Sequence, residues 1–488
     1  MNIVSKKIFF ELIFFFVFST FSFGQQNFSD IFDIAVSRID KLSHQKLYIY
    51  LHNPFKNPLI FNPEKIFING KRVKEGRGEK GAIWYDICPN KVLPNNWAAV
   101  KILFSKKGEV GEKIKVELIT EDGKSIYRQL KVISNPDLKF LSYSFNNQLN
   151  KIYLYLESDE EKNIRRVFIN GKDFTSKTTI KEIVSLNNKN YFFLKITLPK
   201  PLLQGSYLIV KVEGERALNA SIIRVIKPYF PIGMYCIEKG NGEIEEEHLK
   251  DCKEHLINCI HVSFRRTRAG KDIKILQKYG IKALFDPEWG PKLPPVLEKY
   301  KDDPSILAWY VADEPEIYGK GGRPMRFLQA PEKRIQNFRQ LGSRYPVFWT
   351  HCPWHNKYYA YAGIVDIAVL DDYPVCNAPI TRVIKTMKEG MNAYSPAPIW
   401  FVLQAFNGPG YGGRYPTPEE LEFMAYNVVG LGAKGILYFN YGHISEPCYG
   451  VGKPMEELDK LYEKGREKLQ KDLNGIKEDA TRLWKKIK

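Results

Sequence analysis

Cysteine is scarce in this sequence, with seven residues among 488, and no pair has a spacing typical of a zinc site. So few cysteines do not build a disulfide scaffold, and their odd number leaves at least one thiol free. Cys352 with Cys376, and Cys236 with Cys448, are the candidate pairs, with free buried thiols as the alternative. A Gly-x-Ser-x-Gly nucleophile elbow is also absent, which argues against a serine hydrolase of the α/β class.

Long apolar runs are missing except at the N-terminus, where the pattern is that of a secretory signal. Lys6 and Lys7 precede the apolar stretch 8–21, and the region ending at Gly24 fits a cleavage position. We expect residues 1–24 to be a signal peptide, which places the protein in the periplasm, at the cell surface or outside the cell. A retained membrane anchor is the alternative, although the stretch is short for a span. We expect no stable membrane span after cleavage.

Acidic side chains are fewer than basic ones, and the formal net charge is +18. The first half carries most of the excess: residues 1–228 have 36 basic and 22 acidic side chains, whereas residues 229–488 have 37 and 33. The basic first half of the chain favours an anionic partner such as an acidic polysaccharide. The alternative is a lysine-rich surface that is only solvated. No nucleic-acid-binding motif accompanies the charge, so we expect no nucleic-acid partner.

Short alternating segments separated by Asn-Gly and Asp-Gly turns fill the first half, which is typical of β-strands and hairpins. Two of these segments occur twice. The sequence Phe-Ile-Asn-Gly-Lys stands at 67–71 and again at 168–172, and the similar segments 46–51 and 151–156 show nearly the same offset. The repeat predicts two tandem β-sandwich modules of immunoglobulin-like type, over residues 25–135 and 136–228.

Apolar strand-like runs alternate with amphipathic helices from residue 229 to residue 488. We predict eight strands, at 232–237, 259–264, 282–287, 306–312, 347–351, 366–371, 399–405 and 435–440. We predict helices at 245–256, 268–279, 331–343, 379–393, 417–430 and 455–487. Eight such units predict a (β/α)8 TIM barrel. An open doubly wound sheet is the alternative, but no Gly-x-Gly-x-x-Gly turn follows the first strand.

Polar and aromatic residues gather where the predicted strands end, which is where barrels carry their active sites. The candidates are His261, Asp286, Trp289, Asp313, Glu314, His351, Trp354, Asp371, Asp372, Tyr373, Gln404 and Tyr441. Paired carboxylates do acid–base work on glycosidic bonds, and aromatic faces stack on sugar rings. This combination predicts carbohydrate hydrolysis on a poly- or oligosaccharide, with no cofactor and no metal site.

The fourth strand carries a family resemblance. The segment 306–316, Ile-Leu-Ala-Trp-Tyr-Val-Ala-Asp-Glu-Pro-Glu, resembles the fourth strand of retaining clan A glycoside hydrolases, which ends in Asn-Glu-Pro or a variant. In that family the glutamate is the general acid/base, and the resemblance implies this role for Glu314. The segment 371–374, Asp-Asp-Tyr-Pro, is similar to an Asp-x-Tyr-Pro ending on strand six of related barrels. Segments 397–404 and 432–436 also resemble strands seven and eight of this group.

Two positions depart from the family pattern. Asp313 stands where the family usually has asparagine, and Gln404 stands where it has the nucleophilic glutamate. Three hypotheses follow. The catalytic partner of Glu314 is Asp371 or Asp372, or it is a carboxylate of strand three, Asp286 or Glu288. In the third hypothesis the groove binds glycan and has lost catalysis. Side chains alternate along a strand, so only one of the paired aspartates can reach the centre, and we favour Asp371. The rival function is a non-catalytic glycan-binding or surface protein with a degenerate barrel.

Overall fold

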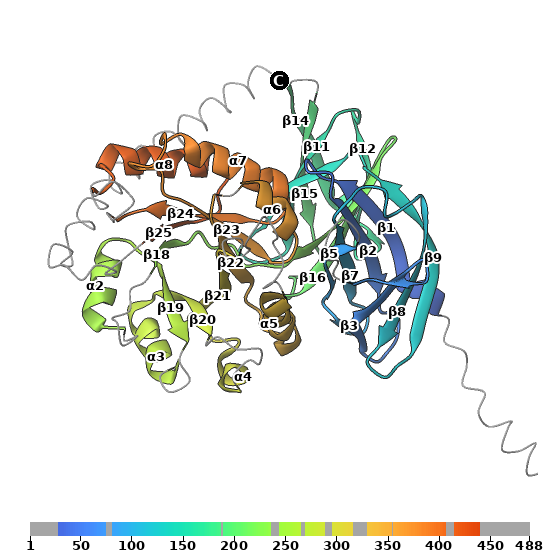
Figure 1. Ribbon diagram of the computed structural model, residues 1–488, viewed down its shortest axis with the longest axis horizontal. Coiled ribbons are helices and arrows are strands. Elements are labelled where there is room, and N and C mark those ends of the chain that lie inside the picture. Colours follow the sequence, from blue (N-terminus) through green and yellow to red (C-terminus); the bar gives the residue numbers. More distant parts are fainter. Residues whose placement is uncertain are drawn as a thin grey trace, which may run out of the picture.

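The computed structural model describes residues 28–74, 81–186, 189–235, 244–264, 269–287, 295–315, 329–353, 355–406 and 414–439. A β-rich part lies beside a barrel whose strands are surrounded by helices (Figure 1). The predicted signal segment lies outside the described residues. Among the residues that are described, no helix has both the length and the apolarity needed to cross a membrane.

The first β-rich region consists of η1 Phe28–Ile31, β1 Phe32–Ile39, β2 Gln45–His52, β3 Leu59–Ile68, β4 Lys71–Arg72, β5 Ala82–Cys88, β6 Lys91–Val92, β7 Trp97–Phe104, β8 Lys113–Thr120 and β9 Ser125–Ser134. The strand order is β4-β3-β8-β9-β1-β2-β7-β5, with β6 paired to β3. Strand β9 joins the two halves of this sheet, because it pairs antiparallel with β8 and its last residues pair parallel with β1. Apolar side chains of both halves share one core.

The second β-rich region consists of β10 Lys139–Phe145, β11 Lys151–Ser158, β12 Ile164–Ile169, β13 Lys172–Asp173, η2 Thr175–Lys177, β14 Thr178–Leu186, β15 Lys189–Thr197, β16 Tyr207–Gly214 and β17 Leu218–Arg224. Two four-stranded sheets, β10-β11-β15-β14 and β13-β12-β16-β17, enclose a common core. The first region has the same order, β1-β2-β7-β5 and β4-β3-β8-β9, apart from the β1–β9 contact that joins its halves.

The repeated Phe-Ile-Asn-Gly-Lys segment forms the same hairpin in both regions. Asn69-Gly70 has φ of 51° and 76°, and Asn170-Gly171 has φ of 50° and 74°, as tight hairpin turns require. The side-chain oxygen of each asparagine accepts a backbone N–H from the neighbouring strand, from Lys115 at 2.8 Å and from Ile209 at 2.9 Å. The sequence repeat is thus also a structural repeat. The immunoglobulin-like class and the module boundaries stay predictions.

Eight parallel strands form a closed barrel in chain order: β18 Ile232–Met234, β19 Cys259–Phe264, β20 Lys282–Pro287, β21 Ile306–Asp313, β22 Val347–His351, β23 Ile367–Asp372, β24 Ile399–Gln404 and β25 Ile436–Phe439. The last strand pairs with the first, so the sheet is not open and the TIM-barrel prediction is confirmed. The surrounding helices are α2 Glu246–Glu254, α3 Ala269–Tyr279, α4 Val296–Tyr300, α5 Gln329–Leu341, α6 His355–Tyr361, α7 Arg382–Tyr394 and α8 Pro418–Gly430. The predicted helix 455–487 lies outside the described residues.

Alternate side chains of the barrel strands fill its interior, as the two-residue period of a strand requires. The inward set includes Cys259, Leu284, Ala308, Tyr310, Phe348, Val369, Val402 and Leu437. Their immediate neighbours in the chain point outward into the layer between strands and helices, where Trp309, Trp349 and Leu370 are buried. We call the opening at the carboxyl ends of the strands the mouth of the barrel. The alternation determines which side chain at each strand end can face the centre of this mouth.

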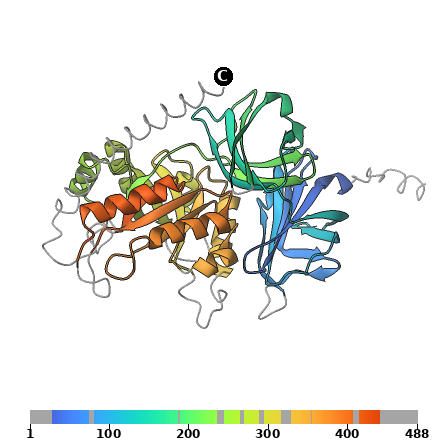
Figure 2. The same ribbon diagram turned by 90° about the horizontal axis from the view of Figure 1, so that it is seen from above.

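The β-rich regions contact the amino-terminal ends of β22 and β23. Arg224, at the end of β17, pairs with Asp366 directly before β23, and its other amino group donates to two backbone carbonyls before β22 at 2.8 and 2.9 Å. Asp86 of β5 pairs with Arg339 of α5. Both regions lie along one flank of the barrel (Figure 2). These contacts lie at the amino-terminal ends of β22 and β23, away from the carboxyl ends of the strands.

Candidate active site

Three rings pack together inside the barrel near the carboxyl ends of β18, β19 and β21. Tyr235 stacks on His261 with ring centroids 4.6 Å apart, and Tyr310 meets His261 edge-on at 4.8 Å. Burial lowers the pKa of His261 to about 4, so its imidazole is neutral near pH 7. The Nε2 atom of His261 is buried and has no hydrogen-bond partner within the described part of the chain. His261 thus belongs to the wall of the mouth.

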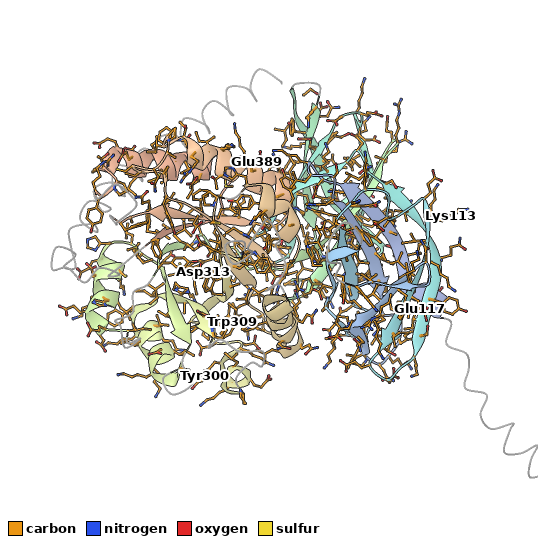
Figure 3. The ribbon with its side chains drawn as sticks, in the orientation of Figure 1. Lys113, Glu117, Tyr300, Trp309, Asp313 and Glu389 are labelled. Atoms are coloured by element: carbon orange, nitrogen blue, oxygen red, sulfur yellow. The ribbon has the colours of Figure 1, made fainter. Side chains whose placement is uncertain are left out.

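Asp313 ends β21 at the exposed centre of the mouth, and Figure 3 shows it in the middle of the barrel. The hydroxyl of Tyr310 donates a hydrogen bond to its carboxylate. Burial raises the pKa of Tyr310 well above its usual value, and the charge of Asp313 raises it further. The phenol therefore keeps its proton and holds the carboxylate of Asp313 in place.

Glu314 follows β21 and has an unusual backbone conformation. Its φ is 35°, in the left-handed region that non-glycine residues seldom adopt, and the residue before a proline normally has an extended conformation. Its N–H donates to the carbonyl of Thr350 at the end of β22, with an N–O distance of 2.9 Å. Thr350 in turn hydrogen-bonds the hydroxyl of Tyr235 at 2.9 Å. Strained residues held in this way cluster at functional sites, and the half-buried side chain of Glu314 is partly open to solvent.

Tyr373 brings the carboxylates of two strands into one electrostatic environment. Burial raises the pKa of its phenol well above the usual value, and the charges of Asp371, Glu314 and Asp313 raise it further. Coulombic influence falls with distance, so the carboxylates of β21 and β23 lie near the same hydroxyl group. Tyr373 also stacks on Phe439 of β25, with ring centroids 5.7 Å apart. The charges of Glu314 and Asp371 thus both act on the phenol of Tyr373.

Of the carboxylates predicted as partners of Glu314, Asp371 and Asp286 belong to inward positions. Asp371 lies two residues after the inward Val369 and is 3% exposed. Asp286 lies two residues after the inward Leu284 and is half-buried. Asp371 and Glu314 both raise the pKa of the Tyr373 phenol. This favours Asp371 as the partner.

Asp372 points away from the mouth, which contradicts the predicted substrate role. It is fully buried on the outer side of β23. The Nε of Arg382 donates to one carboxylate oxygen at 2.7 Å, and the hydroxyl of Thr386 donates to the other at 2.6 Å. Both donors belong to α7, so Asp372 anchors that helix to the barrel.

His351 is also outward, because it alternates with the inward Thr350. It is fully buried among the rings of Trp349, Tyr361 and Tyr394, and its Nε2 hydrogen-bonds the hydroxyl of Tyr394. A side chain in the layer between strands and helices cannot reach a substrate at the mouth. The predicted substrate role of His351 is therefore wrong.

Gln404 is fully buried at the end of β24 and supports the neighbouring loop. Its side-chain oxygen accepts the N–H of Val375 at 2.9 Å, and its amide group donates to the carbonyl of Phe406 at 3.4 Å. A glutamate here would face that carbonyl oxygen without a proton to donate. Gln404 holds the segment after β23 in place. It lies two residues after the inward Val402, and its predicted contact with substrate stays a prediction.

Several predicted features lie outside the described residues: Trp289, Trp354, Tyr441, Glu288, Cys236, Cys448 and the glycine-rich segment 408–413. Cys352 and Cys376, proposed as a pair, are not joined by a disulfide. Within the described ranges, no cluster of histidine, cysteine, aspartate and glutamate could hold a metal ion.

Sequence reasoning missed Tyr235, Tyr310 and Thr350 as parts of the site. Each supports a neighbouring polar group through its hydroxyl or its ring. Their common signal is the two-residue alternation, since each lies on the inward face near a strand end. Extending that alternation from a residue of known orientation would have identified all three.

Comparisons with known proteins find only distant similarity to solved structures. No protein-family model matches the sequence, and no curated protein matches it. An FMN-binding β-glucuronidase from Facaelibacterium prausnitzii L2-6 is 10% identical with a TM-score of 0.34, over 85% of this chain and 75% of that chain. A GH113 β-mannanase from Alicyclobacillus acidocaldarius is 13% identical with a TM-score of 0.34, over 48% of this chain and 97% of that chain. A GH5 xyloglucan-specific endo-β-1,4-glucanase from a metagenomic library is 12% identical with a TM-score of 0.32, over 46% and 88%.

Proposed function

We propose that this protein is a secreted glycoside hydrolase that cleaves a poly- or oligosaccharide at the carboxyl end of its barrel. One arrangement carries the proposal: Glu314 directly follows β21 and Asp371 lies inward near the end of β23, so two carboxyl groups from different parts of the barrel stand at the carboxyl ends of its strands. Two carboxyl groups on either side of one point are the machinery of glycoside hydrolysis. The strained backbone of Glu314 adds support, because such strain is retained where function requires it.

In this proposal Glu314 is the general acid. Its carboxylic acid proton passes to the glycosidic oxygen while the bond from that oxygen to the anomeric carbon breaks. Asp371 acts on the opposite side of the sugar, either by attacking the anomeric carbon or by removing a proton from an attacking water. A carboxyl separation of about 5–5.5 Å supports the first route and about 6.5–9.5 Å the second.

A glycan-binding protein without hydrolytic activity is the second candidate. Gln404 favours it, because a neutral amide stands where the resembling family has its nucleophile, and an amide cannot attack as a carboxylate does. The two candidates differ in whether the bond breaks, and the adjacent aspartates of β23 provide a matched test.

Asp371→Asn is expected to lower the rate of reducing-end release by at least about a hundredfold, because the inward carboxylate takes part in bond cleavage. Asp372→Asn should keep the activity of each folded molecule within a few fold. It should instead lower the melting temperature, because it weakens the buried contact with Arg382 and Thr386. Rates normalised to folded protein, together with calorimetric melting curves, provide the comparison.

Equal rates in the wild type and Asp371→Asn would remove Asp371 from the mechanism. If both variants bound glycan as the wild type does and none of the three proteins released reducing ends, the glycan-binding function would replace hydrolysis.

A further inference from the structure

The outward face of β8 and β9 carries a group of exposed lysines beside one exposed aromatic ring. Lys113 lies directly opposite Lys131 in the antiparallel register, and Lys115 lies opposite Gln129. All four side chains are exposed. Figure 3 shows Lys113 and Glu117 of β8 on the side of the molecule that faces away from the barrel. We call Lys113, Lys115, Tyr127 and Lys131 the lysine face.

The charges of the lysine face are unbalanced. Like charges directly opposite each other on neighbouring strands destabilise a sheet, and Lys113 and Lys131 are such a pair. Lys115 lies two residues along β8 on the same side, about 7 Å away. Among the described residues, none of these three lysines takes part in an ion pair. Glu117, the next outward residue of β8, accepts a hydrogen bond from the hydroxyl of Ser125 at 2.6 Å.

Tyr127 gives the lysine face an apolar surface next to its charge. Its side chain is 63% exposed, although large aromatic rings are usually mostly buried. The ammonium group of Lys115 lies 5.1 Å from the centre of the Tyr127 ring. A flat ring and an adjacent cation match the two sides of a uronic acid residue, whose C–H face is apolar and whose carboxylate is negative.

We propose that the lysine face binds an acidic polysaccharide, with a sugar ring on Tyr127 and successive carboxylates at Lys115, Lys113 and Lys131. The negative charge of the ligand follows from the unbalanced lysines, whereas its being a glycan rests on the proposed function of the barrel. Duplex DNA offers phosphate but no exposed ring face, whereas a uronic acid polymer offers both a carboxylate and an apolar C–H face at each residue. Such a surface holds the polymer while the barrel, on the other side of the β-rich regions, acts on it.

Binding of the full-length protein to polygalacturonate, measured by affinity electrophoresis and by titration, tests this proposal, with dextran as the neutral polymer. We expect binding to polygalacturonate but not to dextran, and a marked weakening when salt rises from 50 to about 300 mM. Lys113→Gln/Lys115→Gln/Lys131→Gln should weaken binding by about tenfold or more. Tyr127→Ala should weaken it as well. The control, Lys162→Gln/Lys172→Gln/Lys200→Gln, has the same net charge, changes exposed lysines elsewhere and should bind as the wild type does.

Equal weakening by both triple variants would overturn the proposal, because binding would then depend on net charge alone. Absence of polygalacturonate binding, or binding only to duplex DNA or phosphatidylserine vesicles, would overturn it too. The outcomes remain separate from the proposed catalysis. Glu314→Gln should bind polygalacturonate normally, and the triple lysine variant should hydrolyse a short soluble substrate normally. Melting curves establish that each variant is folded.

Discussion

Arg224→Met is expected to lower the free energy of unfolding by about 3–5 kcal/mol. Arg224 is buried and pairs with Asp366, which is buried as well. Burial alone would raise the pKa of Asp366, but the charges of Arg224 and Arg339 hold it below its usual value. Removing the guanidinium leaves a buried carboxylate short of its main partner and also removes two hydrogen bonds to backbone carbonyls. Because this ion pair joins β17 to the barrel, its loss should destabilise both the second β-rich region and the barrel.

Arg165→Met provides the matched control. Arg165 and Glu215 form an ion pair in which the arginine is largely exposed, with a nitrogen–oxygen distance of 3.5 Å, so this change should cost less than about 1 kcal/mol. Denaturant unfolding followed by tryptophan fluorescence measures both changes. A loss below about 1 kcal/mol in Arg224→Met would show that the contact between the β-rich regions and the barrel does not depend on this pair.

The Arg224→Met defect should depend on pH in a defined direction. In the wild type the pKa of Asp366 is depressed, so its stabilising contribution is present above about pH 4 and is lost as the pH falls through the folded value. In the variant, the buried carboxylate has lost its main partner and gains stability by taking up a proton. The difference between the two proteins should therefore shrink as the pH falls toward 4.

Glu314→Gln is expected to slow the cleavage of a natural glycoside by about 10²–10⁴-fold while the melting temperature changes little. Glutamine keeps the size of the side chain but cannot give a proton to the leaving oxygen. An aryl glycoside with a dinitrophenolate leaving group needs little protonation, so its cleavage should be much less affected. This contrast between poor and good leaving groups separates loss of an acid from general damage to the site.

Glu298→Gln makes the same substitution in the exposed helix α4, where Glu298 pairs with Lys301. Its rates on both substrates should stay within about twofold of the wild type. Equal loss on good and poor leaving groups in Glu314→Gln would assign Glu314 to substrate positioning instead of proton transfer.

The order and type of the barrel elements could be predicted from the sequence because parallel strands buried on both faces give apolar runs between amphipathic helices. The hairpins of the β-rich regions could also be predicted from the sequence, since Asn69-Gly70 and Asn170-Gly171 supply the positive φ that their turns need. The pairing of β1 with β9 could not be predicted from the sequence, because a contact between the first and last strands of a region leaves no local sequence pattern.

The orientation of side chains at strand ends was harder to predict. All residues of β22 are buried, so the sequence pattern does not show which face is inward, and His351 was placed on the wrong face. Asp371 and Asp372 could be separated because their neighbour Tyr373 fixed the alternation. In β21 the register shifts between Tyr310 and Ala312, which breaks the alternation just before the site.

The most direct test of the proposed hydrolysis is reducing-end release by the wild-type protein on a broad panel of neutral and acidic polysaccharides and oligosaccharides. Continuous release from at least one substrate, lost in Glu314→Gln, is the result we predict. Absence of release across the panel from folded protein that binds one of the same glycans would contradict catalysis and assign the barrel to binding.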